Sequence, residues 1–182
     1  MKPNINLYAS MLTVLLLFWA CDKGPELTPI TQEGKNTFSC KVNGKVWIPD
    51  GRGSIFVIIP PIDGGFFKNS FTDSIEIWIQ ANADNGEEMH IFLSSLDLGK
   101  RTLDAKTHPV GESFTPANYG LFRDSKRTQF ITSESSKGMV LLEIADTTSG
   151  IIAGTFEFTA SDPKGNLVKI TEGRFDINSK TL

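Results

Sequence analysis

The stretch that decides the fold of this chain is residues 38–48, which read FSCKVNGKVWI. Apolar and polar residues alternate on both sides of Asn43-Gly44, a pattern typical of strands that bury one face. Asn-Gly between two such runs predicts a β-hairpin, because both residues of its tight turn need a positive φ. A two-residue turn places Cys40 opposite Trp47, and we expect both side chains to face the core together with Phe38.

The same period of two continues along the chain. Residues 75–93 contain two alternating runs, IEIWIQA and MHIFL, on either side of a turn at 82–87, and residues 54–59 form an apolar run that ends at Pro60-Pro61. A turn with Gly165 is expected to close a hairpin at 161–166. Further strands are predicted at Tyr119–Arg123, Thr128–Thr132, Met139–Ala145, Ile151–Ala160, Leu167–Thr171 and Arg174–Ile177.

Together these patterns predict an all-β fold of about nine or ten short strands, with no substantial helix outside a signal peptide. The expected architecture is an antiparallel β-sandwich or a closed β-barrel, and alternation alone does not separate the two. Residues 60–73 and 104–118 lack periodicity and are predicted to be irregular loops, where functional groups tend to concentrate.

Composition excludes several classes of protein. The chain has 182 residues, of which 40% are hydrophobic and 21% charged, and it contains only two cysteines. This hydrophobic content argues against a disordered tail, and two cysteines are too few for a disulfide scaffold. The chain has one long apolar run, at its start, which argues against a multi-span membrane protein. A net charge of −3 argues against nucleic acid as a partner, since nucleic acid selects a basic surface.

The first 20 residues have the form of a signal peptide. Lys2 precedes an apolar run at 11–19 that is too short to span a membrane, and a small residue, Ala20, comes directly before Cys21. The sequence at 18–21, FWAC, resembles the lipobox of bacterial lipoproteins, in which the cysteine is lipidated and the leader is removed. An ordinary secretory signal is the alternative.

The resemblance implies three segments. Residues 1–20 are a lipoprotein signal peptide, residues 21–36 contain the lipidated Cys21 and a flexible tether rich in Pro, Gly and charge, and residues 37–182 are a single all-β domain. The expected location is the cell envelope, with a lipid anchor in the outer membrane. The sequence does not decide between its periplasmic and its surface leaflet. Because Cys21 is assigned to the lipid, Cys40 is expected to be a buried, inert thiol.

Three motifs carry a resemblance to a known family. They are the NGKVW opening at 43–47, the IAGTFEF run at 152–158 and the ITEGRF run at 170–175. The chain resembles a family of Bacteroidetes-type lipoprotein domains of unknown function, over about residues 37–178. The motifs are structural, and the family supplies no catalytic residues to carry over.

No catalytic or metal-binding motif is present. The two histidines, His90 and His108, lack the spacing of a zinc site, and no cofactor is expected. His90 is predicted to be a surface or cross-strand residue. The adjacent Glu87 and Glu88 are interpreted as solvated charges of a turn rather than a catalytic pair, and Glu76 as an outward-facing strand residue. We therefore predict that the protein is not an enzyme.

Aromatic residues outside the expected core are the candidates for ligand binding. Phe66 and Phe67 fall in the first predicted loop, Trp78 lies on the polar face of its strand, and Tyr119 ends the second loop. Exposed aromatic rings on a β scaffold can stack on sugars or anchor a protein partner. Burial of the same rings in the core is the alternative.

Two short motifs, Asp73-Ser74-Ile75 and Asp146-Thr147-Thr148, resemble the acceptor pattern for O-glycosylation in bacteria of this kind. Ser74 and Thr147 are the acceptors that the pattern implies. The function expected from all these features is a membrane-anchored envelope lipoprotein with a non-enzymatic domain that binds a glycan, a small ligand or an envelope protein. The alternatives are a structural envelope component without a soluble ligand and, with less support, a glycan hydrolase.

Overall fold

The computed structural model of the protein describes residues 24–53, 57–70, 72–105 and 118–182. These residues contain strands and no helix, which confirms the predicted all-β class. The strands are β1 (Thr37–Val42), β2 (Lys45–Trp47), β3 (Arg52–Gly53), β4 (Ile58–Ile59), β5 (Ile62–Lys68), β6 (Ile75–Asn82), β7 (Glu88–Leu93), β8 (Gly99–Leu103), β9 (Tyr119–Arg123), β10 (Gln129–Ile131), β11 (Gly138–Asp146), β12 (Ile151–Ser161) and β13 (Leu167–Asn178).

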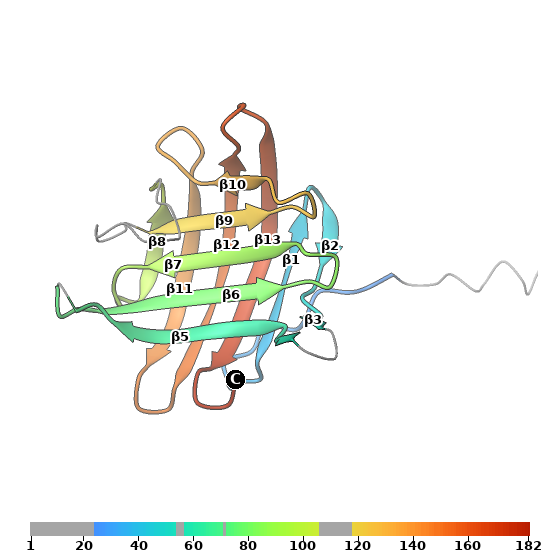
Figure 1. Ribbon diagram of the computed structural model, residues 1–182. Coiled ribbons are helices and arrows are strands. Elements are labelled where there is room, and N and C mark those ends of the chain that lie inside the picture. The colour runs from blue at the N-terminus through green and yellow to red at the C-terminus, as the bar shows by residue number, and fades with distance from the viewer. Residues whose placement is uncertain (1–23, 54–56, 71, 106–117) are drawn as a thin grey trace, which may run out of the picture.

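The strands form two layers whose directions cross (Figure 1). The front layer has the order β10-β9-β7-β6-β5, and the rear layer has the order β2-β1-β13-β12-β11-β8. All pairs are antiparallel, and the layers are joined by one backbone pair, Ile131 with Ser161. The sheet does not close on itself, so the architecture is a sandwich, and the closed barrel is wrong. Both architectures bury every second residue, and for that reason alternation could not distinguish them.

The hairpin of β1 and β2 forms as predicted. Asn43 and Gly44 have φ angles of 48° and 82°, which is the backbone that the tight turn requires. Cys40 pairs with Trp47, and both are buried in the core together with Phe38. Burial raises the pKa of the Cys40 thiol far above its usual range, so this cysteine is the inert core residue that was expected.

The core lies between the two layers. Strands β6 and β7 turn Ile77, Ile79, Met89 and Ile91 inward, where they are fully buried in one cluster with residues of β11, β12 and β13. Phe158 of β12 belongs to this cluster and lies against the backbone of β9, because an added Cβ at position 120 would come within 2.8 Å of its ring.

Two predictions of local structure need correction. The stretch 60–73 contains strand β5, although its prolines and paired glycines are typical of a loop. Gly64 pairs with Ile79 of β6 and approaches so closely that an added Cβ would lie 2.1 Å from the Trp78 carbonyl oxygen. The strands predicted at 167–171 and 174–177 are one strand, β13, which continues through an irregularity at Glu172, where φ is 51°.

The segment before β1 is packed on the domain. Its residues were expected to be a flexible tether, but Asp176 of β13 accepts hydrogen bonds from the Thr31 hydroxyl and from the backbone N–H groups of residues 33–35. The Thr28 N–H also donates to the Ser39 hydroxyl. Burial alone would raise the pKa of Asp176, but these hydrogen bonds outweigh it and lower the pKa. The packed domain therefore begins near Thr28, before the predicted start at Thr37.

Candidate functional site

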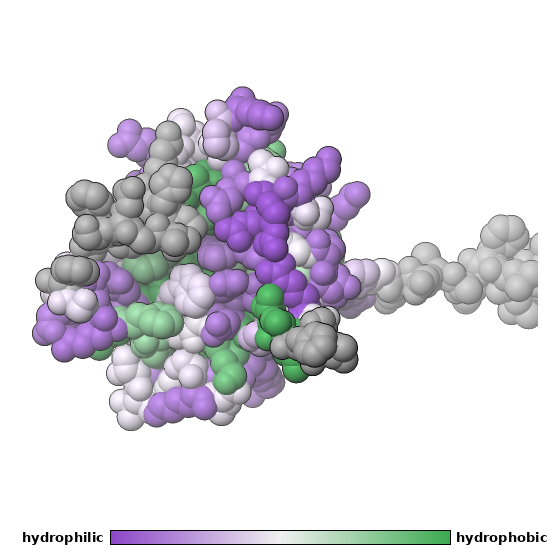
Figure 2. Space-filling view, in the orientation of Figure 1, coloured by the Kyte–Doolittle hydropathy of each residue, from purple (hydrophilic) through white to green (hydrophobic). Residues whose placement is uncertain are grey.

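The candidate site lies on the outer face of the front layer, which we define as the surface of β5, β6, β7, β9 and β10 that turns away from the core. Because strand residues alternate, this face receives the residues between the core positions. Hydrophilic residues gather where β9 ends and β7 begins (Figure 2). The face is made by Phe67, Glu76, Trp78, Gln80, Asn82, Glu88, His90, Phe92, Tyr119, Leu121 and Arg123, as the strand register shows.

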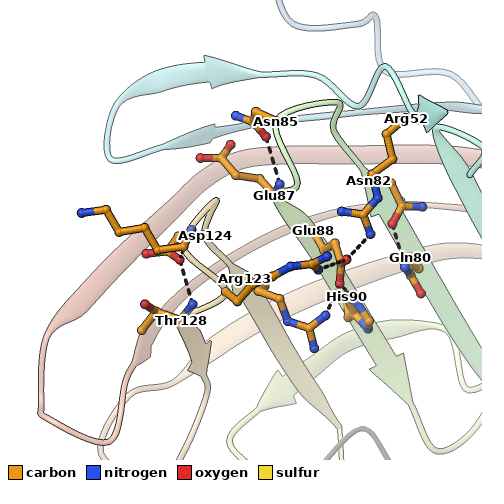
Figure 3. Close-up of polar contacts among 12 residues, drawn as sticks. Arg52, Gln80, Asn82, Asn85, Glu87, Glu88, His90, Arg123, Asp124 and Thr128 are labelled. Carbon is orange, nitrogen blue, oxygen red and sulfur yellow. Dashed lines mark hydrogen bonds and ion pairs between the residues drawn. The ribbon is translucent and has the colours of Figure 1, made fainter. Parts of the chain in front are cut away.

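At its polar end, three guanidinium groups converge on the carboxylate of Glu88 (Figure 3). Arg52 Nη2 donates to Glu88 Oε1 over 2.6 Å, and Arg127 Nη1 donates to the same oxygen over 3.0 Å. Arg123 Nη1 donates to the other oxygen, Oε2. We call Arg52, Glu88, His90, Arg123 and Arg127 the arginine cluster.

Each arginine comes from a different segment. Arg52 lies in the short β3–β4 hairpin, Arg123 ends β9, and Arg127 lies in the turn between β9 and β10. The Asp124 carboxylate shapes this turn by accepting hydrogen bonds from the Thr128 and Lys126 N–H groups. Arg127 has a φ of 68°, a conformation that costs about 1–3 kcal/mol for a residue other than glycine and that the surrounding structure must impose.

The surroundings keep Glu88 ionised. Its pKa falls from an ordinary 4.5 to about 2: the nearby His90 imidazole has the largest effect, burial opposes the shift, and Arg52 and Arg123 add to it. Three positive charges face this one carboxylate. No other carboxylate among the described residues pairs with these arginines, so the cluster has an excess of positive charge.

His90 is a buried polar residue without a hydrogen-bond partner. Its side chain is 7% exposed, and neither ring nitrogen forms a hydrogen bond with any described residue. Nε2 lies 3.7 Å from Glu88 Oε2, which is too far for a hydrogen bond and close enough for electrostatic interaction. Leaving a buried polar group unpaired costs about 1–3 kcal/mol, so His90 is available to a group that enters the cluster.

Of the four aromatic residues proposed from the sequence, two form an accessible pair. The rings of Phe67 and Trp78 meet edge to face with centroids 5.8 Å apart, and Phe67 is 46% exposed. The Trp78 ring also lies 6.0 Å from the His90 ring, so the pair adjoins the arginine cluster. Phe66 is on the inner side of β5 and packs against the core.

Tyr119 is buried rather than presented to solvent. Its ring stacks on Phe92 with centroids 5.4 Å apart, and burial raises its pKa to about 12. The two aromatic residues form a small buried cluster with Leu121 on the outer face.

The carboxylates also differ from their sequence interpretation. Glu88 is buried in β7, whereas it was predicted to be a solvated turn residue, and Glu87 accepts a hydrogen bond from Trp47 Nε1 over 2.9 Å. Glu76 faces outward as expected but is buried, with a hydrogen bond from Asn69. Extending the alternation of β7 back by one step would have placed Glu88 beside His90. The arginines had no such signal, because they lie 35 to 39 residues away.

The remaining sequence-predicted residues lie elsewhere. Thr147 is exposed in the turn between β11 and β12, and Ser74 is partly exposed before β6. Cys21 and the signal peptide lie outside the described residues, as does His108. Among the described residues, no group of three or more His, Cys, Asp or Glu side chains could hold a metal ion. Nor do these residues include a helix with the length and apolarity that crossing a membrane takes.

The outer surface of the rear layer is hollowed but lacks a comparable cluster. A hollow of about 330 Å³ over β11, β12 and β13 is lined by Met139, Glu157, Thr159 and Lys169, among others. A second of about 250 Å³ adjoins it and also touches Ile30 of the packed N-terminal segment. Among the described residues that line these hollows, no set of side chains converges on one carboxylate as in the arginine cluster.

Fold and site together define an all-β sandwich domain with a charged candidate binding face. A family described as a domain of unknown function (DUF6252) matches residues 63–176, and the chain belongs to this family. The match runs from β5 to β13 and contains every member of the arginine cluster except Arg52, which lies before it. No curated protein and no solved structure matches the chain.

Proposed function

We propose that the protein is a lipid-anchored envelope protein whose β-sandwich binds a ligand, without catalysis, through the outer face of its front layer. The observation that carries this proposal is that an accessible aromatic pair and a cluster with excess positive charge adjoin on one sheet face. Aromatic rings supply stacking surface for a sugar or an apolar group, and polar side chains beside them fix its orientation.

The lipid anchor is supported by the leader at 1–20 and by Cys21 after it, and the resemblance to Bacteroidetes-type lipoproteins fits the same assignment. Since the packed domain begins near Thr28, six residues, 22–27, link it to the lipidated cysteine, which makes seven Cα–Cα steps. Such a link reaches about 25 Å when fully extended. The anchored domain would therefore stay close to the outer membrane, on either its periplasmic or its surface leaflet.

The state of Glu88 argues against glycan hydrolysis. A glycosidase needs a carboxylic acid whose pKa is raised, so that it can protonate the leaving group. The pKa of Glu88 is instead lowered to about 2, and its two oxygens are occupied by arginine N–H groups. This carboxylate is suited to organising the face and unsuited to acid catalysis.

Ser74 and Thr147 remain candidates for O-glycosylation. The exposed turn around Thr147 would admit a modifying enzyme, whereas the Ser74 hydroxyl shares a hydrogen bond of 2.7 Å with Thr72. Intact-mass measurement of the protein from its native envelope tests both sites. A mass without added sugar contradicts this part of the proposal.

Ligand binding is tested with the full chain in a non-ionic detergent, on an array of envelope glycans and by thermal melting with each hit. A ligand at 100 times its Kd adds about 2.7 kcal/mol to the stability, which raises Tm by several degrees. We expect Phe67→Ala and Trp78→Ala to abolish the shift, and the control Leu98→Ala, which removes an exposed apolar side chain elsewhere, to retain it.

Two other outcomes would redirect the assignment. Binding that survives both aromatic substitutions would remove the outer face from the proposal. No binding across the array would favour a structural envelope component or a protein partner. Labelling with radioactive palmitate, lost in Cys21→Ser, tests the anchor separately.

A further inference from the structure

The arginine cluster has the composition of a site for an anionic group. Three guanidinium groups offer many more N–H donors than one carboxylate can accept. The hydrogen bonds to Glu88 are the ones that the Arg52, Arg123 and Arg127 side chains make among the described residues. Among the described residues, no second carboxylate pairs with these guanidinium groups, and no other group accepts a hydrogen bond from them.

His90 is the second, independent observation. It lies on the same strand as Glu88, two residues further, and its ring is buried within the cluster, where neither nitrogen forms a hydrogen bond with a described residue and Nε2 lies 3.7 Å from Glu88 Oε2. An ion-pair cluster that served only to join strands would not need a buried imidazole whose nitrogens form no hydrogen bond. A ligand atom that hydrogen-bonds with His90 would remove the free-energy cost of this unpaired group.

Access to the cluster is from the side of Arg127. The Arg127 side chain is 59% exposed, whereas those of Arg52 and Arg123 are each 20% exposed. An anion approaching from solvent therefore meets Arg127 first and reaches the more buried guanidinium groups next. Planar guanidinium groups recognise carboxylate, sulfate and phosphate oxygens with paired hydrogen bonds.

We propose that the arginine cluster is an oxyanion subsite, in which Arg52, Arg123 and Arg127 bind the oxygens of an anionic group and His90 provides a further hydrogen bond. This inference deepens the proposed function and rests on it for the role of the outer face. The ligand is thereby specified as one that carries a carboxylate, sulfate or phosphate group, next to an apolar or sugar-like part that contacts Phe67 and Trp78.

The test uses three probes, sodium glucuronate, sodium sulfate and inorganic phosphate, each titrated into the full chain at constant ionic strength. Two-dimensional NMR of the histidine side-chain nitrogens is the direct readout. The chain has two histidines, so His90→Gln assigns the signals and His108 is the internal reference. We expect a saturable change of the His90 signals, and the preferred probe separates carboxylate from tetrahedral anions.

Three variants distinguish a subsite from a general effect of salt on stability. Arg127→Gln is expected to weaken binding at least tenfold, and Glu88→Gln to strengthen it, because the competing carboxylate is gone. Arg101→Gln is the matched control: Arg101 is 19% exposed and pairs with the single carboxylate of Asp97, and its loss should leave the Kd unchanged. Sulfate stabilises proteins nonspecifically, and such an effect would be equal in all variants.

The proposal is overturned if none of the probes changes the His90 signals, or if Arg127→Gln and Arg101→Gln bind equally well. Its failure is distinguishable from failure of the proposed function. A neutral glycan that binds in a Trp78-dependent manner while all three anions fail would retain the binding domain and reject the oxyanion subsite.

Discussion

The two faces of the front layer both contain buried side chains, yet these side chains are chemically opposite. On the inner face, Ile79 and Met89 are fully buried among apolar side chains. On the outer face of the same strands, Glu88 and His90 are almost as well buried, but they are polar. Burial of apolar surface is favourable by itself, whereas burial of a charge requires a partner. The inner face therefore needs only apolar side chains that pack closely. The outer face needs charged partners for Glu88, which come from other segments of the chain.

The largest effect is expected on the inner face. Ile79→Ala or Met89→Ala removes a fully buried side chain and leaves a cavity, so each should lower the free energy of unfolding by about 2–5 kcal/mol. Urea unfolding measures the loss. Leu167→Ala, at an exposed position of β13, is the control and should stay close to the wild type. A loss below 1 kcal/mol for both core variants would contradict the layer arrangement.

On the outer face, Glu88→Gln tests how much the buried carboxylate contributes to the free energy of unfolding. It retains the shape of the side chain but leaves three guanidinium groups without their carboxylate, at a cost of about 2–4 kcal/mol. The matched control is Asp97→Asn, which breaks one exposed ion pair and should cost no more than about 1 kcal/mol. Equal stability of these two variants would mean that the cluster is no more than a set of surface charges.

Acid should destabilise the protein through the outer face, where Glu88 titrates, because the inner face of the front layer is apolar. The folded pKa of Glu88 is lowered to about 2 from 4.5, so its contribution is fully present above pH 4.5 and is lost as the pH falls toward 2. Asp176 of β13, in the rear layer, adds to the loss of stability in acid, since its pKa is also lowered in the folded state. We expect Tm to fall over this window in the wild type and to fall less in Glu88→Gln. Parallel curves would contradict this assignment.

The smallest effect concerns the backbone of Arg127. Arg127→Ala loses the ion pair and keeps a strained φ of 68°, whereas Arg127→Gly loses the same ion pair and relieves the strain. The glycine variant should therefore be more stable than the alanine variant by about 0.5–1 kcal/mol. Thermal melting of the pair checks this difference. An alanine variant that is the more stable of the two would show that the turn carries no strain.

Features set by residues close together in the sequence could be predicted, whereas features set by residues far apart in the sequence could not. The β1–β2 register could be predicted because the Asn43-Gly44 turn and its alternating flanks are adjacent in the chain. Strand β5 was missed because its prolines and glycines favour a loop, and pairing with β6 overrides that preference. In the candidate site, Phe67 and Trp78 were found as aromatic residues outside the core pattern. The arginine cluster was missed because no local pattern connects Arg52 or Arg127 with Glu88.

The sequence by itself determined that the chain is all-β, where most of its strands lie and that Cys40 is buried. These properties depend on alternation and turn conformation, which neighbouring residues decide. The tertiary structure alone decided that the sheet forms an open sandwich, that Asp176 holds residues 31–35, and that three arginines meet at one carboxylate. Each of these depends on the order in which distant strands pair, and the sequence of a single strand does not specify which strands it pairs with.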